Sequence, residues 1–138
     1  MIVTKWKSSK EVVIPINKYR IKWNKAPSKG QQKLQDFLVH FWEYDIVLAE
    51  MRIPGSKKRC DIVNCNKKVI IEYSPLSHHN NFNPFFHGNR SNFLKSIKSD
   101  YDKMMWAESN GFLFVEVTEA DLDNLNKEYF SKTFNLNL

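Results

Sequence analysis

The 138-residue sequence has few of the features that mark membrane, secreted or disulfide-stabilised proteins. It contains no run of 18 or more apolar residues, so no transmembrane helix is predicted. Its first ten residues, MIVTKWKSSK, lack the apolar core of a signal peptide, and only two cysteines are present. We therefore expect an intracellular protein of the cytoplasm that has no disulfide framework.

Acidic residues are the scarcer kind of charge. The chain has 15 Asp and Glu against 21 Lys and Arg, which gives a formal net charge of +6. Hydrophobic residues make up 42% of the sequence and aromatic residues 14%, enough to bury a core, so a wholly disordered chain is excluded. The length fits one domain. The basic surplus indicates a polyanion such as nucleic acid as the partner.

Residues 1–27 differ in composition from the rest of the chain, with seven basic residues against one acidic residue. Val12–Ile16 predicts a short edge strand, because it contains a proline. Apolar and basic residues alternate over 19–23, which predicts a half-buried strand. The segment is either an arm that grips phosphates or the solvated face of edge strands. Its candidates for DNA contact are Lys22 and Lys25.

Residues 28–138 carry the signals of a mixed α/β domain. Ser28 is a suitable N-cap for a first helix that ends near residues 42–44. Later elements are expected as strands at Ile46–Arg52, Arg59–Val63 and Lys68–Tyr73, a helix at Phe93–Asn110, a strand at Phe112–Val117 and a last helix capped by Thr118. A meander followed by a helical crossover predicts a single domain with a mixed central β-sheet flanked by helices.

Acidic residues occur in each of the first three predicted strands. Glu50, Asp61 and Glu72 each stand beside strongly apolar residues, where an unpaired buried carboxylate would be costly. Carboxylates that converge at a sheet end repel one another unless a cation lies between them, and Mg²⁺ prefers such oxygen ligands. The alternative is that Asp61 and Glu72 form ion pairs with nearby lysines and arginines of the hairpin.

A zinc site is a second possibility for the same region. Its candidate ligands are Cys60, Cys65, His78, His79 and His87. Their spacing matches no common zinc motif, and small thiols in or beside a strand are ordinary core residues.

Four stretches of the chain share their order and spacing with one nuclease family. They are SKGQQKLQDFL, RIPGSKKRCDIV, KKVIIEYSPLSHH and FLKSIKSDYDKMMWAESNGFLFVEV. Together they resemble the PD-(D/E)XK superfamily, whose fold is restriction-endonuclease-like. The nearest likeness is to the EDxHD branch, which contains the very-short-patch repair endonuclease and certain phage homing endonucleases. The resemblance covers residues 28–117, about two thirds of the chain.

The resemblance implies a set of catalytic roles. Asp61 would be the central ligand of Mg²⁺ (or Mn²⁺), and Glu50 and Glu72 would be supporting ligands. The branch's catalytic histidine falls at His78, and the adjacent His79 remains open. An acidic residue about eleven positions before Gly111 corresponds to Asp100, which would orient the histidine or a water molecule.

The chain departs from the family's pattern at two places. Ser74 stands where classical members carry a lysine, and in the EDxHD branch a histidine takes over that work. Gln31 or Gln32 stands where the opening helix often carries a glutamate. The first acid of the motif is then Glu50, or it is missing and the site has decayed.

The resemblance therefore implies a metal-dependent DNA endonuclease of the phage homing type that acts in an infected host cell. Double-stranded DNA is the expected partner, no membrane is involved, and a homodimer would extend the surface that reads a DNA site. The alternatives are a decayed DNA-binding protein of the same fold and a branched-DNA or Holliday-junction nuclease. Further candidates for DNA contact are Arg59, His87, Arg90, Lys95 and Lys98.

Overall fold

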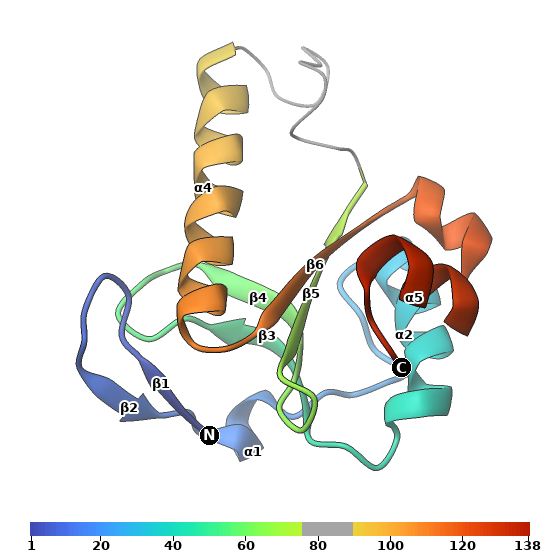
Figure 1. Ribbon diagram of the computed structural model, residues 1–138, viewed down its shortest axis with the longest axis horizontal. Coiled ribbons are helices and arrows are strands. Elements are labelled where there is room, and N and C mark those ends of the chain that lie inside the picture. The colour runs from blue at the N-terminus through green and yellow to red at the C-terminus, as the bar shows by residue number, and fades with distance from the viewer. Residues whose placement is uncertain (76–89) are drawn as a thin grey trace.

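The computed structural model describes residues 1–75 and 90–138, and within 90–100 it describes only the side chain of Lys98 (Figure 1). The first half comprises β1 (Ile2–Thr4), β2 (Glu11–Val13), α1 (Ile16–Tyr19), α2 (Lys29–Trp42), β3 (Val47–Arg52) and β4 (Arg59–Asn64). The second half comprises β5 (Val69–Ser74), α4 (Arg90–Ser109), β6 (Leu113–Thr118), the 3₁₀ helix η1 (Ala120–Asn124) and α5 (Lys127–Phe134).

The central sheet has four strands in the order β3-β4-β5-β6. β3, β4 and β5 form an antiparallel meander, and β6 pairs parallel with β5 after the crossover through α4. This arrangement confirms the prediction of a mixed α/β domain and places all four strands within a few residues of their expected positions. β1 and β2 form a separate two-stranded antiparallel sheet.

Helices and the small hairpin cover both faces of the central sheet, as Figure 1 shows. One core cluster joins α2, η1 and α5 to one face, with Leu38, Ile71 and Phe130 among its buried residues. The other joins the β1–β2 hairpin and α4 to the opposite face, with Ile70 and Trp106 among its buried residues. The continuously apolar run in β5 is buried on both faces for this reason, as its sequence predicts.

The first predicted helix is confirmed together with its cap. The Ser28 hydroxyl accepts a hydrogen bond from the Gln31 amide at 3.2 Å, and the helix ends at Trp42. Gly30, in the first turn, lies directly beneath the Tyr73 ring of β5, so closely that a Cβ on Gly30 would overlap the Tyr73 side chain. The absence of a side chain at Gly30 thus lets α2 approach β5.

Two expectations about local structure are wrong. Residues 19–23 do not form a strand: α1 ends at Tyr19, and the chain then touches β3 through a single bridge between Arg20 and Leu48. Residues 21 and 23 nevertheless face the core, which explains their alternation. Thr118 does not cap a continuous last helix, because its amide and hydroxyl donate to Asp121. The chain forms η1 instead, and Asn126 caps α5.

Among the residues that the structure describes, no helix has the length and apolar character needed to cross a membrane.

The contact between Gly30 and Tyr73 generates a stability prediction. Gly30→Ala should lower the free energy of unfolding by about 1–3 kcal/mol, because the new methyl group overlaps the Tyr73 ring. In a Tyr73→Ala background the same change should be neutral or stabilising, since alanine is the better helix former. Urea unfolding of the wild type, the two single variants and the double variant measures the cost of Gly30→Ala in each background. An equal loss of unfolding free energy in both backgrounds would show that the overlap with Tyr73 is not the cause.

Candidate active site at the fork of the central sheet

The central sheet divides into two pairs of strands at its middle. The pairing of β4 with β5 extends from Asn64↔Val69 to Ile62↔Ile71. Beyond that point β4 stays paired with β3 as far as Arg59, whereas β5 stays paired with β6 as far as Ser74. Figure 1 shows β5 and β6 turning away together from β3 and β4. The two strands that part leave backbone amides without a ladder partner.

Two carboxylates replace the missing ladder hydrogen bonds at this fork. The Asp61 amide donates to Glu72 Oε2 at 2.6 Å, and the Tyr73 amide donates to Asp61 Oδ2 at 2.8 Å. Each carboxylate is therefore held by the backbone of the opposite strand. The resulting geometry fixes two negative charges next to each other in the opening between β4 and β5.

The two carboxylates belong to an acidic row that crosses the sheet. Continuing the β4–β5 register by one residue places Asp61 opposite Glu72. The pairs that flank Glu50 on β3 place it opposite Asp61, and Glu72 pairs with Glu116 of β6. Glu72 and Glu116, which are regularly paired, project from the same face of the sheet. We define the acidic row as Glu50, Asp61, Glu72 and Glu116.

Glu50 interrupts the regular pairing of β3 with β4. Its φ of 52° is in the left-handed region, which a non-glycine residue adopts at a cost of about 1–3 kcal/mol. Such strain is concentrated at functional sites, where the surrounding structure enforces it. Gln31 of α2 hydrogen-bonds to the Glu50 side chain and so connects the opening helix to the acidic row.

Lys103 of α4 brings a positive charge to the fork. Its ammonium group forms an ion pair with Glu72 Oε1 and donates a hydrogen bond to the Arg59 carbonyl at 3.2 Å. Both members of the pair are largely buried, with the side chains of Lys103 and Glu72 15% and 11% exposed. The two strand ends and the helix thus meet at one charged centre.

A hollow of about 220 Å³ opens at this centre. Three residues of the acidic row line it together with Lys103, and the full lining is Asp61, Glu72, Tyr73, Ser74, Lys103, Phe114 and Glu116. The hollow is large enough to admit a small anionic group or several water molecules to the carboxylates.

Burial and charge shift the titration of these groups. Burial, and then repulsion from Asp61, raise the pKa of Glu72 to about 7, although Lys103 opposes the shift. Burial alone would lower the pKa of Lys103, but the adjacent Glu72 carboxylate outweighs it and the pKa is raised. The pKa of Glu50 is raised by burial, against the hydrogen bond from Gln31. The fork is therefore short of positive charge, a condition that an added cation would relieve.

The ligand chemistry of the fork fits Mg²⁺ better than zinc. Mg²⁺ is commonly held by one or two carboxylates while it keeps several waters and binds substrate phosphates. Asp61 and Glu72 provide two such carboxylates beside an open hollow. Within residues 1–75 and 101–138 no group of three or more His, Cys, Asp and Glu side chains that could hold a metal ion of any kind is present. Burial also raises the pKa of the Cys60 thiol.

None of the other predicted site residues is found at the β4–β5 hollow among the residues that the structure describes. His78, His79 and His87 lie outside the described residues. Asp100, Arg90 and Lys95 belong to α4, but their side chains are outside the described part of the structure. Arg59 and Lys98 have exposed side chains. Lys22 and Lys25 line a groove at the edge of β3, away from the β4–β5 hollow.

Two residues of the fork escaped sequence reasoning. Neither Lys103 nor Glu116 is among the site residues that the sequence predicts. The alternation of FLFVEV in β6 signals that Glu116 faces the same side as Phe114, but only the parallel register with β5 shows that it meets Glu72. Lys103 follows the predicted Asp100 by about one helical turn, a signal that could have drawn attention to it.

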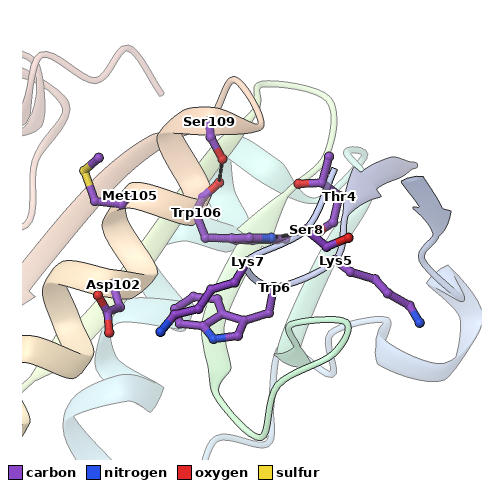
Figure 2. Close-up of a pocket in the computed structure, with 9 residues that line it drawn as sticks. All are labelled: Thr4, Lys5, Trp6, Lys7, Ser8, Asp102, Met105, Trp106 and Ser109. Atoms are coloured by element: carbon purple, nitrogen blue, oxygen red, sulfur yellow. Dashed lines mark hydrogen bonds between the residues drawn. The ribbon is translucent and has the colours of Figure 1, made fainter. Parts of the chain in front are cut away.

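A second hollow, of about 300 Å³, lies between the N-terminal hairpin and α4 (Figure 2). Trp6 and Trp106 line it, with Lys7 extending over the Trp6 ring and Asp102 on the helix side. The Trp106 indole donates to the Thr4 carbonyl at 2.9 Å, which fastens the hairpin to α4. This contact makes the hairpin part of the folded core.

The raised pKa of Glu72 predicts how stability depends on pH. A carboxyl group that binds its proton more tightly when folded makes the free energy of unfolding fall as pH rises from about 4.5 to about 7. Glu72→Gln removes this group. Between pH 5 and pH 8 the free energy of unfolding of the variant should therefore fall by about 1–3 kcal/mol less than that of the wild type. Denaturant unfolding in EDTA at both pH values measures the difference, and parallel losses in the two proteins would contradict the assignment.

Comparison with known proteins adds no relative to this description. No family model matches the chain, and neither a curated protein nor a solved structure matches it. The function of the fork is accordingly argued from its own residues and geometry.

Proposed function

We propose that this protein is a metal-dependent DNA endonuclease with a restriction-endonuclease-like core, which hydrolyses phosphodiester bonds in double-stranded DNA. The observation that carries the proposal is the fork between β4 and β5. There the Asp61 and Glu72 carboxylates are fixed by backbone amides, and Glu72 forms an ion pair with Lys103 beside an open hollow. Two carboxylates and a lysine at a sheet end suit the hydrolysis of a phosphate diester.

Asp61 and Glu72 would hold Mg²⁺ or Mn²⁺, with Glu50 in support through its link to Gln31. The ion, when bound, supplies positive charge that stabilises the scissile phosphate and acidifies a water molecule. Glu72 would have to exchange its contact with Lys103 for the metal. The raised pKa of Glu72 favours this exchange, because an added cation stabilises its ionised form.

Lys103 would provide the positive charge that Ser74 cannot provide. Ser74 is buried at the position where the resemblance leads one to expect a lysine. Lys103 reaches the same hollow from α4 rather than from β5. With Glu72 turned to a bound metal, the Lys103 ammonium, with three donors, would bind a phosphate oxygen or orient the attacking water.

The remaining catalytic roles stay predictions from the sequence. His78 or His79 would act as general base, a task that suits the near-neutral pKa of histidine, and Asp100 would orient it. A homing endonuclease of the phage type is the finer form of the proposal. A decayed DNA-binding protein and a branched-DNA nuclease are the alternatives that the experiments must separate.

Cleavage of supercoiled plasmid with Mg²⁺ tests the proposal directly. The plasmid should carry DNA from the gene's own neighbourhood, in case the enzyme prefers its natural site. We expect nicking or linearisation that EDTA abolishes and that Asp61→Asn and Lys103→Met each reduce by about 10²–10³-fold. Asp123→Asn, at an exposed position of η1, is the matched control and should cleave normally.

Undiminished cleavage by Asp61→Asn would overturn the assignment of the site. DNA binding without any cleavage would favour the decayed protein instead. Preferential cutting of a four-way junction over a linear duplex of equal length would favour the branched-DNA nuclease.

Mg²⁺ binding tests the exchange at Glu72 independently of cleavage. Mg²⁺ at about 100 times its Kd should stabilise the wild type by about 2.7 kcal/mol, and Asp61→Asn should lose this effect. Lys103→Met should bind Mg²⁺ more tightly, because the competing ammonium is gone, and yet cleave more slowly. Thermal unfolding at several Mg²⁺ concentrations measures the affinity, and weaker Mg²⁺ binding by Lys103→Met would contradict the exchange.

A further inference from the structure

The positive charge of the protein is concentrated at one end of the chain. Seven of the 21 basic residues and one of the 15 acidic residues lie within residues 1–27. Residues 28–138 therefore hold 14 residues of each sign and carry no formal net charge. Any attraction that the protein exerts on a polyanion through its net charge originates in the first 27 residues.

The fold separates these seven basic residues into two groups. Lys5, Lys7 and Lys10 belong to the β1–β2 hairpin, and Lys5 and Lys7 line the hollow that Asp102 also lines. The other four lie in α1 and in the segment that leads to α2. They are Lys18, Arg20, Lys22 and Lys25, and all four side chains are exposed.

The second group lines a groove at the edge of β3. The segment runs beside that edge, where the Ile21 amide donates to the Val47 carbonyl at 2.9 Å and Arg20 forms its bridge with Leu48. The groove has a volume of about 340 Å³ and contains all four basic residues together with Tyr19 and Ala49. None of its lining residues is acidic. We define these four basic residues and Ala49 as the β3-edge groove.

The β3-edge groove adjoins the acidic row along β3. Ala49 lines the groove, and the next residue along β3 is Glu50, the first member of the row. Ala49 is paired with Ile62, which is adjacent to Asp61. A chain of negative charges that lies in the groove therefore passes beside Glu50, the β3 end of the acidic row. Lys5 and Lys7 of the hairpin line a different hollow, between β1 and α4, where the acidic side chain of Asp102 is also present (Figure 2).

We propose that the β3-edge groove binds the sugar-phosphate backbone of duplex DNA on one side of the acidic row. This inference rests on the proposed function for its orientation toward the acidic row. Lys18, Arg20, Lys22 and Lys25 neutralise successive phosphates, and the contact is independent of base sequence. It positions the duplex beside Glu50, at the β3 end of the acidic row. DNA is favoured over an acidic protein or an anionic membrane because the acidic row next to the groove is suited to phosphate diesters.

The salt dependence of DNA binding tests the groove. Each phosphate that a basic side chain neutralises adds about 0.9 to the slope of log Kobs against log salt. We define the groove variant as the protein with Lys18→Gln, Arg20→Gln, Lys22→Gln and Lys25→Gln. Its slope should be smaller in magnitude than that of the wild type by about 3–4. It should also bind a linear duplex about 10²–10³-fold more weakly at low salt. Binding is measured in EDTA, so that no DNA is cut.

A charge-matched variant separates the groove from net charge in general. Lys10→Gln, Lys57→Gln, Lys67→Gln and Lys127→Gln remove four charges from exposed positions outside the groove. This variant should change the slope by less than about 1. Equal changes of the salt slope in the two variants would overturn the proposal. The proposal would also fail if the groove variant lost binding to phosphatidylserine vesicles or to an acidic polypeptide but kept its binding to DNA. Thermal unfolding confirms that both variants are folded.

The outcomes distinguish this inference from the proposed function. If the wild type cleaves and the groove variant binds DNA like the charge-matched variant, the groove assignment fails while the endonuclease stands. If the groove variant alone loses binding and the wild type cleaves under no condition, the groove stands and the endonuclease fails. At low salt and high protein concentration the groove variant should still cleave, because it retains Asp61, Glu72 and Lys103.

Discussion

The interlock between two carboxylates and two backbone amides at the β4–β5 fork determines the rest of the site. When paired strands part, their amides must find other acceptors, because an unsatisfied buried donor costs about 1–3 kcal/mol. Asp61 and Glu72 accept from each other's strands and so hold the fork open. The same contacts bring two carboxylates together in a largely buried place, where a neighbouring cation becomes necessary. In the structure described here that cation is Lys103.

The position of Lys103 depends in turn on the N-terminal hairpin. α4 carries Lys103 one turn before Trp106, whose indole donates to Thr4 of β1. Asn110, just after α4, accepts from the Thr4 amide and donates to its hydroxyl. These contacts join residues more than 100 positions apart and hold the C-terminal half of α4 against the sheet. A segment with the composition of a basic arm is thereby also a structural support of the charged centre.

α2 supports the opposite side of the fork. Gly30 allows the Tyr73 ring to lie against the first turn of the helix, and the Tyr73 amide is one of the two donors that hold the carboxylates. The next residue, Gln31, is buried and hydrogen-bonds to Glu50. A single helical turn thus contacts both β3 and β5 on either side of Asp61. Gln31, one of the two glutamines at the place where the resemblance leads one to expect a glutamate, is thus a neutral partner of Glu50. Gln32 instead donates to the Trp23 carbonyl and to Asp36.

The amino-acid sequence by itself determined the local elements and the identity of the central acids. Apolar periodicity and the Ser28 cap predicted α2, and the apolar run of β5 predicted a strand covered on both faces, because these signals depend on near neighbours in the chain. Asp61 and Glu72 stood out because charged residues rarely occur inside such apolar strands. The tertiary structure alone decided that β4 and β5 part at these residues, that Glu116 joins their row and that Lys103 faces them. Strand register and helix placement depend on contacts between residues far apart in the chain. Local sequence patterns do not predict those contacts.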